Sequence, residues 1–167
     1  SEDSEAMRRC LKDLGARLEE RGHTLAIEGF GDEPRQVKEL DVGNAGAVLR
    51  FLMSIASLCE EVTFVDNYPE SLGKRPHDDL IKALEQMNVR VSHRDGKLPI
   101  TIHGGNPQGG RIQVSGEVSS QYLSSLLFLT PLLKEDSEIT VLDDLKSKVV
   151  VGQTLDVLKQ AGIEIEA

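Results

Sequence analysis

Long hydrophobic runs are absent from this sequence of 167 residues. Its two longest apolar stretches, residues 51–59 and 126–130, are far shorter than the roughly 20 residues that cross a bilayer as a helix. The first five residues, Ser-Glu-Asp-Ser-Glu, also lack the basic and apolar parts of a secretory signal. We therefore expect neither a membrane span nor a signal peptide.

Cysteine is scarce, with Cys10 and Cys59 as its two occurrences. Both lie in apolar segments with helical spacing, which favours two small core residues over a disulfide or a pair of ligands. The spacing does not resemble a zinc site, and we expect no metal. Reduced cysteines are typical of a cytoplasmic protein, which is the location we expect.

Basic residues are fewer than acidic ones: the chain has 19 Lys and Arg residues and 28 Asp and Glu residues, for a formal net charge of -9. This balance argues against a nucleic-acid partner, whose binding depends on neutralising phosphates. A small anionic ligand stays compatible, because a local pocket can oppose the global charge. The length and the 39% of hydrophobic residues suit one domain with a core of its own.

A repeat of about 73 residues organises the chain. Three segments have helical apolar spacing, then a residue that favours a left-handed helix end, then a short alternating strand. Leu11, Leu84 and Leu158 occupy equivalent places in them, 73 and then 74 residues apart. We expect a single domain, 1–167, that lacks the first strand and helix of its opening unit. Its units lie near residues 1–43, 44–116 and 117–167.

The polarity of the repeat indicates buried helices and solvent-facing sheets. Residues 120–133 are apolar nearly all round, as in a helix that is buried on most sides. The strands instead alternate apolar with polar residues, so each shows one face to water. The prediction is an α/β (α+β) fold of repeated βαβαββ units. Further helices are expected at 6–14, 47–58, 80–87 and 153–161, and strands at 16–18, 24–28, 61–66, 89–91, 99–103, 111–114, 138–143 and 163–165.

Two loops in equivalent places of the repeat could hold an anion. Residues 41–46, Asp-Val-Gly-Asn-Ala-Gly, open the helix that contains Arg50. Glycines at a helix N-terminus let an anion approach the exposed N–H groups. Residues 116–121, Gly-Glu-Val-Ser-Ser-Gln, bring two hydroxyls and an amide to the next such helix. The alternatives are an ordinary glycine loop with an Asn cap and a simple serine cap.

A third loop, Gly-Lys-Arg-Pro at residues 73–76, precedes the repeated helix. If Pro76 sits in the first helical turn, Arg75 becomes a planar cation at a fixed point, suited to a carboxylate or a phosphate. The alternative is a solvated basic pair on a turn. Its equivalent in the last unit is Lys146-Ser147-Lys148. The four histidines have the pattern of surface or strand residues, and His77 is of interest because it lies beside this turn.

Taken in order, the Gly-Asn-Ala-Gly, Lys-Arg-Pro, Ser-Ser-Gln and Lys-Ser-Lys motifs resemble the family of 5-enolpyruvylshikimate-3-phosphate (EPSP) synthases over the whole chain. The resemblance implies most of the N-terminal domain of an inside-out α/β fold, in which a second, C-terminal domain completes the enzyme. It also implies transfer of an enolpyruvyl group from phosphoenolpyruvate to shikimate 3-phosphate, without metal or organic cofactor. Glyphosate is the inhibitor that this family implies.

The resemblance assigns roles to residues in these motifs. Ser119, Ser120 and Ser147 would hold shikimate 3-phosphate, and Gln121 would touch both substrates. The remaining implied residues line the site for phosphoenolpyruvate or glyphosate: Arg75, Asn44, Gly46 and Arg50. A methyl group at Gly46 would crowd that anion.

The sequence departs from the family pattern in several places. Ala47 and Phe51 stand where Thr and Pro are common, and Val149-Val150 replace a Pro-Tyr pair. These differences bear on substrate affinity and glyphosate sensitivity rather than on the fold. The acid–base residues of the family come from a second domain and from an N-terminal Lys-Ser-x-Ser-x-x-Arg loop without counterpart here. We therefore expect this chain alone to be catalytically inert.

Three alternatives stay open at this point. The enolpyruvyl transferase that acts on UDP-N-acetylglucosamine shares the fold, but it would carry a reactive cysteine near the Arg-Pro turn, and Cys59 sits in an apolar helix end. RNA 3′-terminal phosphate cyclase has similar units, yet the acidic charge speaks against it. A non-catalytic module that binds an anionic metabolite is the third.

Overall fold

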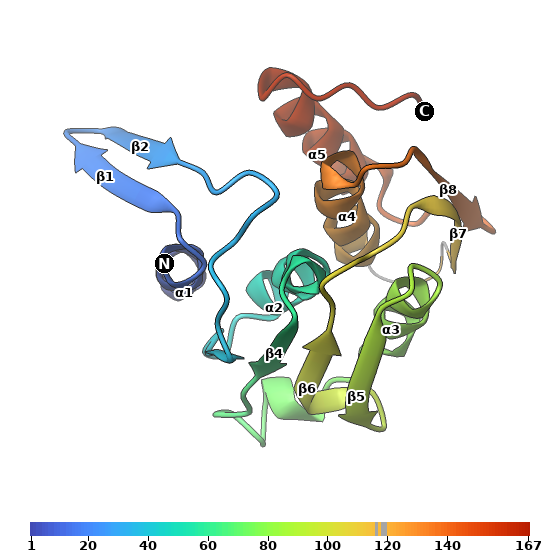
Figure 1. The fold of residues 1–167 in the computed structure, drawn as a ribbon, viewed down its shortest axis with the longest axis horizontal. Helices are drawn as coiled ribbons and strands as arrows, with labels where there is room; N and C mark the ends of the chain where they lie inside the picture. Colours follow the sequence, from blue (N-terminus) through green and yellow to red (C-terminus); the bar gives the residue numbers. More distant parts are fainter. Residues whose placement is uncertain (116, 118–119) are drawn as a thin grey trace.

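A computed structural model describes residues 1–115, 117 and 120–167, and it has the mixed α/β architecture expected from the sequence (Figure 1). The helices are α1 (Glu2–Asp13), α2 (Gly46–Ile55), α3 (Asp78–Glu85), α4 (Ser120–Leu129) and α5 (Lys148–Gln160). Three short 3₁₀ helices are η1 (Ala56–Leu58), η2 (Leu72–Lys74) and η3 (Thr130–Leu132). The strands are β1 (Arg17–Arg21), β2 (Thr24–Glu28), β3 (Glu39–Leu40), β4 (Glu61–Phe64), β5 (Arg90–Arg94), β6 (Lys97–His103), β7 (Gly110–Ser115) and β8 (Ser137–Leu142).

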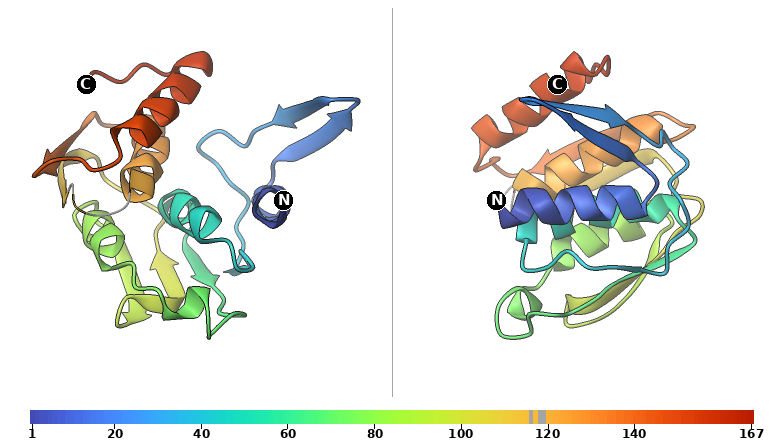
Figure 2. Two further views of the ribbon diagram at one scale, coloured as in Figure 1. Left: turned by 180° about the vertical axis from the view of Figure 1, so that it is seen from behind. Right: turned by 90° about the vertical axis from the view of Figure 1, so that its left-hand side faces the viewer.

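Helices α2 and α4 form the centre of the molecule, and most of the strands lie around them (Figure 2). In α4, eight of the ten residues are buried, as the apolar pattern of this segment predicted. The hydroxyl of Ser125 donates to the carbonyl of Arg50 at 2.5 Å and so ties α4 to the backbone of α2. Phe51 and Phe128 meet edge to face, with ring centroids 5.3 Å apart. The two helices are therefore joined by both polar and aromatic contacts.

A four-stranded sheet, in the order β3-β4-β6-β5, covers one side of the helices. Strand β3 runs parallel to β4, and β6 runs antiparallel to both of its neighbours. The β5–β6 hairpin turns at Asp95 and Gly96, whose φ angles of 55° and 71° suit a two-residue type I′ turn. At the far end of β6, a Cβ on Gly104 would lie 2.1 Å from the carbonyl oxygen of Ser57, so this close approach to η1 requires glycine.

The repeat is visible as two equivalent strand–helix–strand units. β3, α2 and β4 form the first, and β7, α4 and β8 form the second, each with a parallel strand pair. Each central helix continues directly into a 3₁₀ turn, η1 or η3. The β1–β2 hairpin extends away from the other elements (Figure 1). Most expected elements are confirmed within a few residues, whereas the short strand β3 was not expected.

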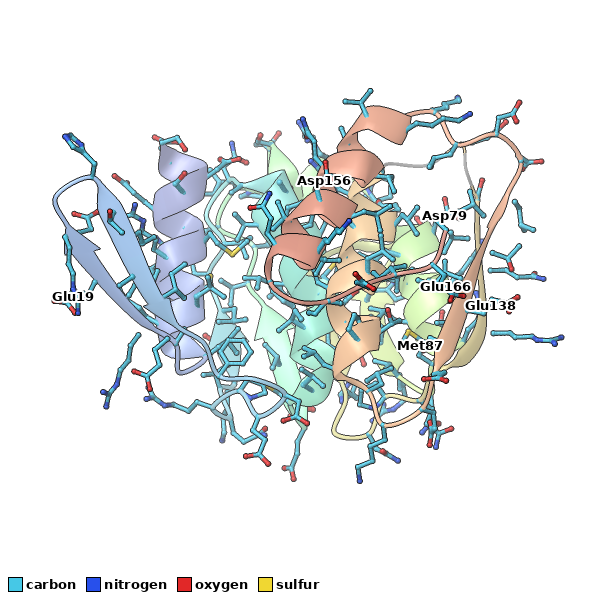
Figure 3. The ribbon with its side chains drawn as sticks, turned by 90° about the horizontal axis from the view of Figure 1, so that it is seen from above. Glu19, Asp79, Met87, Glu138, Asp156 and Glu166 are labelled. Atoms are coloured by element: carbon cyan, nitrogen blue, oxygen red, sulfur yellow. The ribbon has the colours of Figure 1, made fainter. Side chains whose placement is uncertain are left out.

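One expected strand, residues 163–165, does not form. Its counterparts β1 and β5 each pair with the strand that follows a tight turn. Two residues follow Ile165, so the 167 residues contain no such hairpin partner. This segment and β8 instead border an open groove of about 870 Å³, to which Glu138 and Glu166 both contribute (Figure 3).

Two further expectations concern the core and membranes. Cys10 and Cys59 are both free and fully buried, as expected for core residues. Burial raises the pKa of Cys59, which disfavours a reactive thiolate there. Within the described residues, no helix is long and apolar enough to cross a membrane.

Candidate functional site

Two guanidinium groups converge on Gly46 at the beginning of α2. A Cβ placed on Gly46 would lie 3.5 Å from Nη1 of Arg50 and 3.5 Å from Nη1 of Arg75. Arg50 comes from the next turn of α2, and Arg75 comes from the loop between η2 and α3. The structure therefore brings Arg75, from the Gly-Lys-Arg-Pro loop, beside Gly46 and Arg50, which the sequence had placed at the beginning of one helix.

The N-terminus of α2 adds to this positive region. The helix has ten residues, and its N-cap is Ala45, which offers no side-chain acceptor to the first N–H groups. The alternative of an Asn cap at this helix is therefore wrong. The free N–H groups and the helix dipole favour an anion at the same end of α2.

Asn44 has a different role from capping. Its side-chain Oδ1 accepts a hydrogen bond from the backbone N–H of Leu72 at 3.1 Å. Leu72 begins η2, and Arg75 follows that 3₁₀ turn. Asn44 therefore holds the loop of Arg75 against the loop before α2.

Gln121 joins the cluster from α4. Its Oε1 accepts a hydrogen bond of 2.6 Å from Nη1 of Arg50. This contact connects the two equivalent helix starts of the repeat, because Gln121 is the second residue of α4. The amide thus holds one edge of the Arg50 guanidinium.

The structure describes two of the three serines that were predicted to bind a phosphate. Ser119 lies outside the described residues. Ser120 is the first residue of α4 and is buried. Ser147 precedes α5 as its N-cap residue and is exposed, with no side-chain bond to that helix. Among the described residues, no hydrogen bond joins Ser147 to the arginine cluster. Its assignment to a phosphate stays a prediction.

The cluster carries positive charge that the surrounding acidic groups leave unpaired. Among the described residues, neither Arg50 nor Arg75 forms an ion pair, whereas the neighbouring Lys74 pairs with Glu70 at 3.0 Å. Arg50 is half-buried, and its Nε has no hydrogen-bond partner in the described part of the chain. Two guanidiniums and a helix N-terminus can receive a carboxylate or a phosphate with several charge-assisted hydrogen bonds.

The structure around His77 differs from the sequence predictions in two respects. It is fully buried rather than a surface or strand residue, and it serves as the N-cap of α3. Helix α3 begins at Asp78, so Pro76 lies just before the helix and not in its first turn. Burial, and then the charges of Arg50 and Arg75, lower the pKa of His77 from 6.5 to about 4, against the smaller opposing effect of Asp78.

Tyr122 is the residue of this region that the sequence did not single out. Its ring lies 5.9 Å from the Arg50 guanidinium carbon, within the range of a cation–π contact. Its hydroxyl donates to the carbonyl of Pro76 at 3.2 Å and lies 3.3 Å from Nδ1 of His77. In the sequence it appears as one more apolar residue of α4, so its position beneath the two arginines had no sequence signal.

Comparison with known proteins identifies first the class and then the family. The fold matches a solved structure of EPSP synthase from Acinetobacter baumannii with a TM-score of 0.80 at 21% identity, over 100% of this chain and 38% of that one. It also matches the enolpyruvyl transferase NikO from Streptomyces tendae with a TM-score of 0.65 at 13% identity, over 97% and 36% of the two chains. These matches define the enolpyruvyl transferase fold.

Sequence comparison is more specific. The model of the EPSP synthase family, 3-phosphoshikimate 1-carboxyvinyltransferase, matches residues 1–167. A protein of that name from Deinococcus radiodurans is 50% identical over the whole chain and 38% of its own length. Another from Methanocella arvoryzae is 41% identical over 99% of this chain and 40% of its own. The chain belongs to the EPSP synthase family, and it spans about two fifths of the length of these relatives.

Proposed function

We propose that this chain forms one wall of the active site of a 3-phosphoshikimate 1-carboxyvinyltransferase. The reaction would transfer the enolpyruvyl group of phosphoenolpyruvate to shikimate 3-phosphate and release phosphate. Membership of the family supports this proposal. We expect that neither metal nor organic cofactor takes part. A cytoplasmic location stays a prediction from the sequence.

The convergence of Arg50 and Arg75 on Gly46 carries the proposal. Phosphoenolpyruvate has a carboxylate and a phosphate, and planar guanidiniums bind both kinds of group in bidentate fashion. Gly46 leaves the space beside both Nη1 atoms free, so that an anion can approach them and the N–H groups of α2. We assign Arg75, Gly46 and Arg50 to the phosphoenolpyruvate or glyphosate side of the site, with Asn44 as the residue that holds the Arg75 loop.

The second substrate is assigned to the beginning of α4. Ser119, Ser120 and Ser147 would hold shikimate 3-phosphate, and Gln121 would lie between the two substrates. The hydrogen bond between Gln121 and Arg50 supports this intermediate place for Gln121. The contacts of the serines with a phosphate rest on the family resemblance alone.

In this proposal the chain binds and orients substrates but does not complete the chemistry. Among the described residues near the cluster, His77 has a pKa lowered to about 4 and is buried, so it is a poor general acid. Addition and elimination at the enolpyruvyl carbon require acid–base groups from outside this wall. We therefore expect no turnover by the 167 residues alone.

A chimaera tests the proposed function. The chain replaces the matching 38% of the Deinococcus radiodurans relative, and phosphate release is measured with phosphoenolpyruvate and shikimate 3-phosphate. We expect release by the chimaera and none by the separate chain. Arg75→Ala should reduce the rate strongly, whereas the control Lys74→Ala should leave it near that of the unmodified chimaera, because Lys74 pairs with Glu70. A folded chimaera without activity would contradict the proposal.

A further inference from the structure

A buried pair of side chains lies directly beneath the two arginines. His77, at the start of α3, is fully buried, and Tyr122, on the first turn of α4, is nearly so. Their rings lie 6.2 Å apart at an angle of 65°. Tyr122 contacts Arg50 through its ring and Pro76, the neighbour of Arg75, through its hydroxyl. The pair therefore contacts Arg50 directly and Arg75 through its neighbour Pro76.

The positions of the polar atoms favour one arrangement of the protons. The single phenolic proton of Tyr122 is donated to the carbonyl oxygen of Pro76 at 3.2 Å. The contact of 3.3 Å between Tyr122 Oη and His77 Nδ1 then needs a proton on Nδ1. His77 Nε2 has no hydrogen-bond partner in the described part of the chain, which suits a bare lone pair better than an orphaned N–H. Both contacts are satisfied by the neutral Nδ1–H tautomer.

Burial, and then the charges around His77, keep it neutral by lowering its pKa. Arg50 from α2 and Arg75 from the preceding loop oppose a further positive charge, and Asp78 on α3 favours it more weakly. Tyr122 on α4 is uncharged, because burial raises its pKa. A protonated His77 would have to donate from both ring nitrogens, and Tyr122 Oη can accept from only one of them.

We propose that His77 and Tyr122 are positioning residues that set the arginine pair, with His77 as a neutral Nδ1–H donor. The chain of contacts runs from His77 to the Tyr122 hydroxyl, from there to Pro76, and from the Tyr122 ring to Arg50. The inference deepens the proposed function, because it concerns the same anion site, but its first test needs no substrate.

The first test observes the side chains of the free protein by NMR. Spectra of ¹⁵N-labelled histidine rings between pH 8 and 4.5 should show His77 as the Nδ1–H tautomer, and the ring of exposed His23 serves as the reference signal. Hydrogen exchange at the buried Nε–H of Arg50 reports how firmly that guanidinium is held. A His77 ring that is protonated on Nε2 alone would overturn the proposal.

Three variants separate positioning from general packing. His77→Leu and Tyr122→Phe keep an apolar filling but remove the donor or the hydroxyl, whereas His77→Asn keeps a donor near the place of Nδ1. We expect Arg50 Nε–H exchange to rise about tenfold in the first two and by less than about twofold in His77→Asn and in the control His23→Asn. Equal exchange in all four variants would overturn the proposal, and the fold of each is checked by its amide spectrum.

Binding of inorganic phosphate gives the second readout. The dissociation constant should rise about five- to tenfold in His77→Leu and Tyr122→Phe, as for the loss of one hydrogen bond that orients a charged group, and His77→Asn should restore it. Unchanged affinity in both variants would contradict positioning. If the parent chain binds no phosphate at all, the anion site of the proposed function fails, and the exchange at Arg50 still decides whether the pair positions it.

Discussion

At the residue scale, the site depends on the absence of a side chain at Gly46. Gly46 has no side chain, and both Nη1 atoms lie 3.5 Å from the position that its Cβ would occupy. The separation of 3.5 Å is an ordinary van der Waals distance, so a methyl group would fit without forcing the arginines apart. The same methyl group would occupy the space that an anion needs. Binding and folding thus make different demands on this position.

Gly46→Ala should therefore separate the two properties. The free energy of unfolding should stay the same or rise by less than about 1 kcal/mol, because alanine is the better helix residue. The affinity for phosphoenolpyruvate should fall by about tenfold or more, or ~1.4 kcal/mol. Urea unfolding and calorimetric titration measure the two effects. Unchanged affinity would show that Gly46 does not line the anion site.

Arg75→Ala should cost about 1.5–3 kcal/mol of anion binding, which is typical of a hydrogen bond to a charged group. Lys74→Ala is the matched control, since Lys74 is the adjacent cation and is exposed and paired with Glu70. Calorimetric titration with phosphoenolpyruvate compares the two variants at one ionic strength. Equal losses in both would mean that general charge, and not the position of Arg75, binds the anion.

His77 makes a pH-dependent contribution to stability. Its pKa is about 4 in the folded chain and 6.5 when solvated, so the unfolded chain binds the proton first as the pH falls. The contribution is complete above pH 6.5 and is lost as the pH falls toward 4, by about 3 kcal/mol in total. Urea unfolding at several pH values should give a steeper dependence for the parent chain than for His77→Asn. Identical slopes would show that His77 is not buried as a neutral ring.

Sequence reasoning reached some residues of the site and not others. The motifs singled out Gly46, Arg75 and Gln121, because glycine, arginine and polar residues at helix starts have a local meaning. The partnership of His77 with Tyr122 depends on how α3 docks against α4, which is a tertiary property. The alternative interpretation of Asn44 as a helix cap was wrong for the same reason, since its side chain bonds to a distant loop. Local chemistry was predictable, and long-range pairing was not.

At the element scale, α2 and α4 are the framework that holds the site. Both helices are mainly apolar, and each delivers one partner of the Arg50–Gln121 hydrogen bond. Their burial followed from the sequence, because almost no face of α4 is polar. The strand expected at residues 163–165 does not form. Unlike the burial of a helix, strand pairing depends on a neighbouring strand and not on the segment alone.

Leu126→Ala should test this framework. Leu126 is fully buried in α4, and its truncation should lower the free energy of unfolding by about 2–5 kcal/mol through lost burial and the cavity left behind. Val157→Ala on α5 is the control, because Val157 is 60% exposed and should change stability by less than about 0.5 kcal/mol. Urea unfolding gives both values. A small effect of Leu126→Ala would contradict a core built on α4.

At the scale of the whole molecule, a chain with net charge -9 brings two arginines together, and in the part that the structure describes neither forms an ion pair. The net charge of the chain does not predict this local positive region, because charges that are screened by solvent act only over about 10 Å. The inside-out layering places the beginnings of α2 and α4 in contact, and that contact brings the two motifs of the repeat into one site. This arrangement is the basis of the proposal that the chain forms one wall of an enolpyruvyl transferase site.

The most direct test of this account is a titration of phosphoenolpyruvate into the ¹⁵N-labelled chain, followed through its backbone amides and arginine side chains. The account predicts saturable shifts at Gly46, at the Nε–H signals of Arg50 and Arg75, and at Gln121, all with a single dissociation constant. It also predicts their loss in Arg75→Ala and their persistence in Lys74→Ala. Shifts spread over surface lysines without saturation, or no shifts at millimolar ligand, would contradict an anion site at the start of α2.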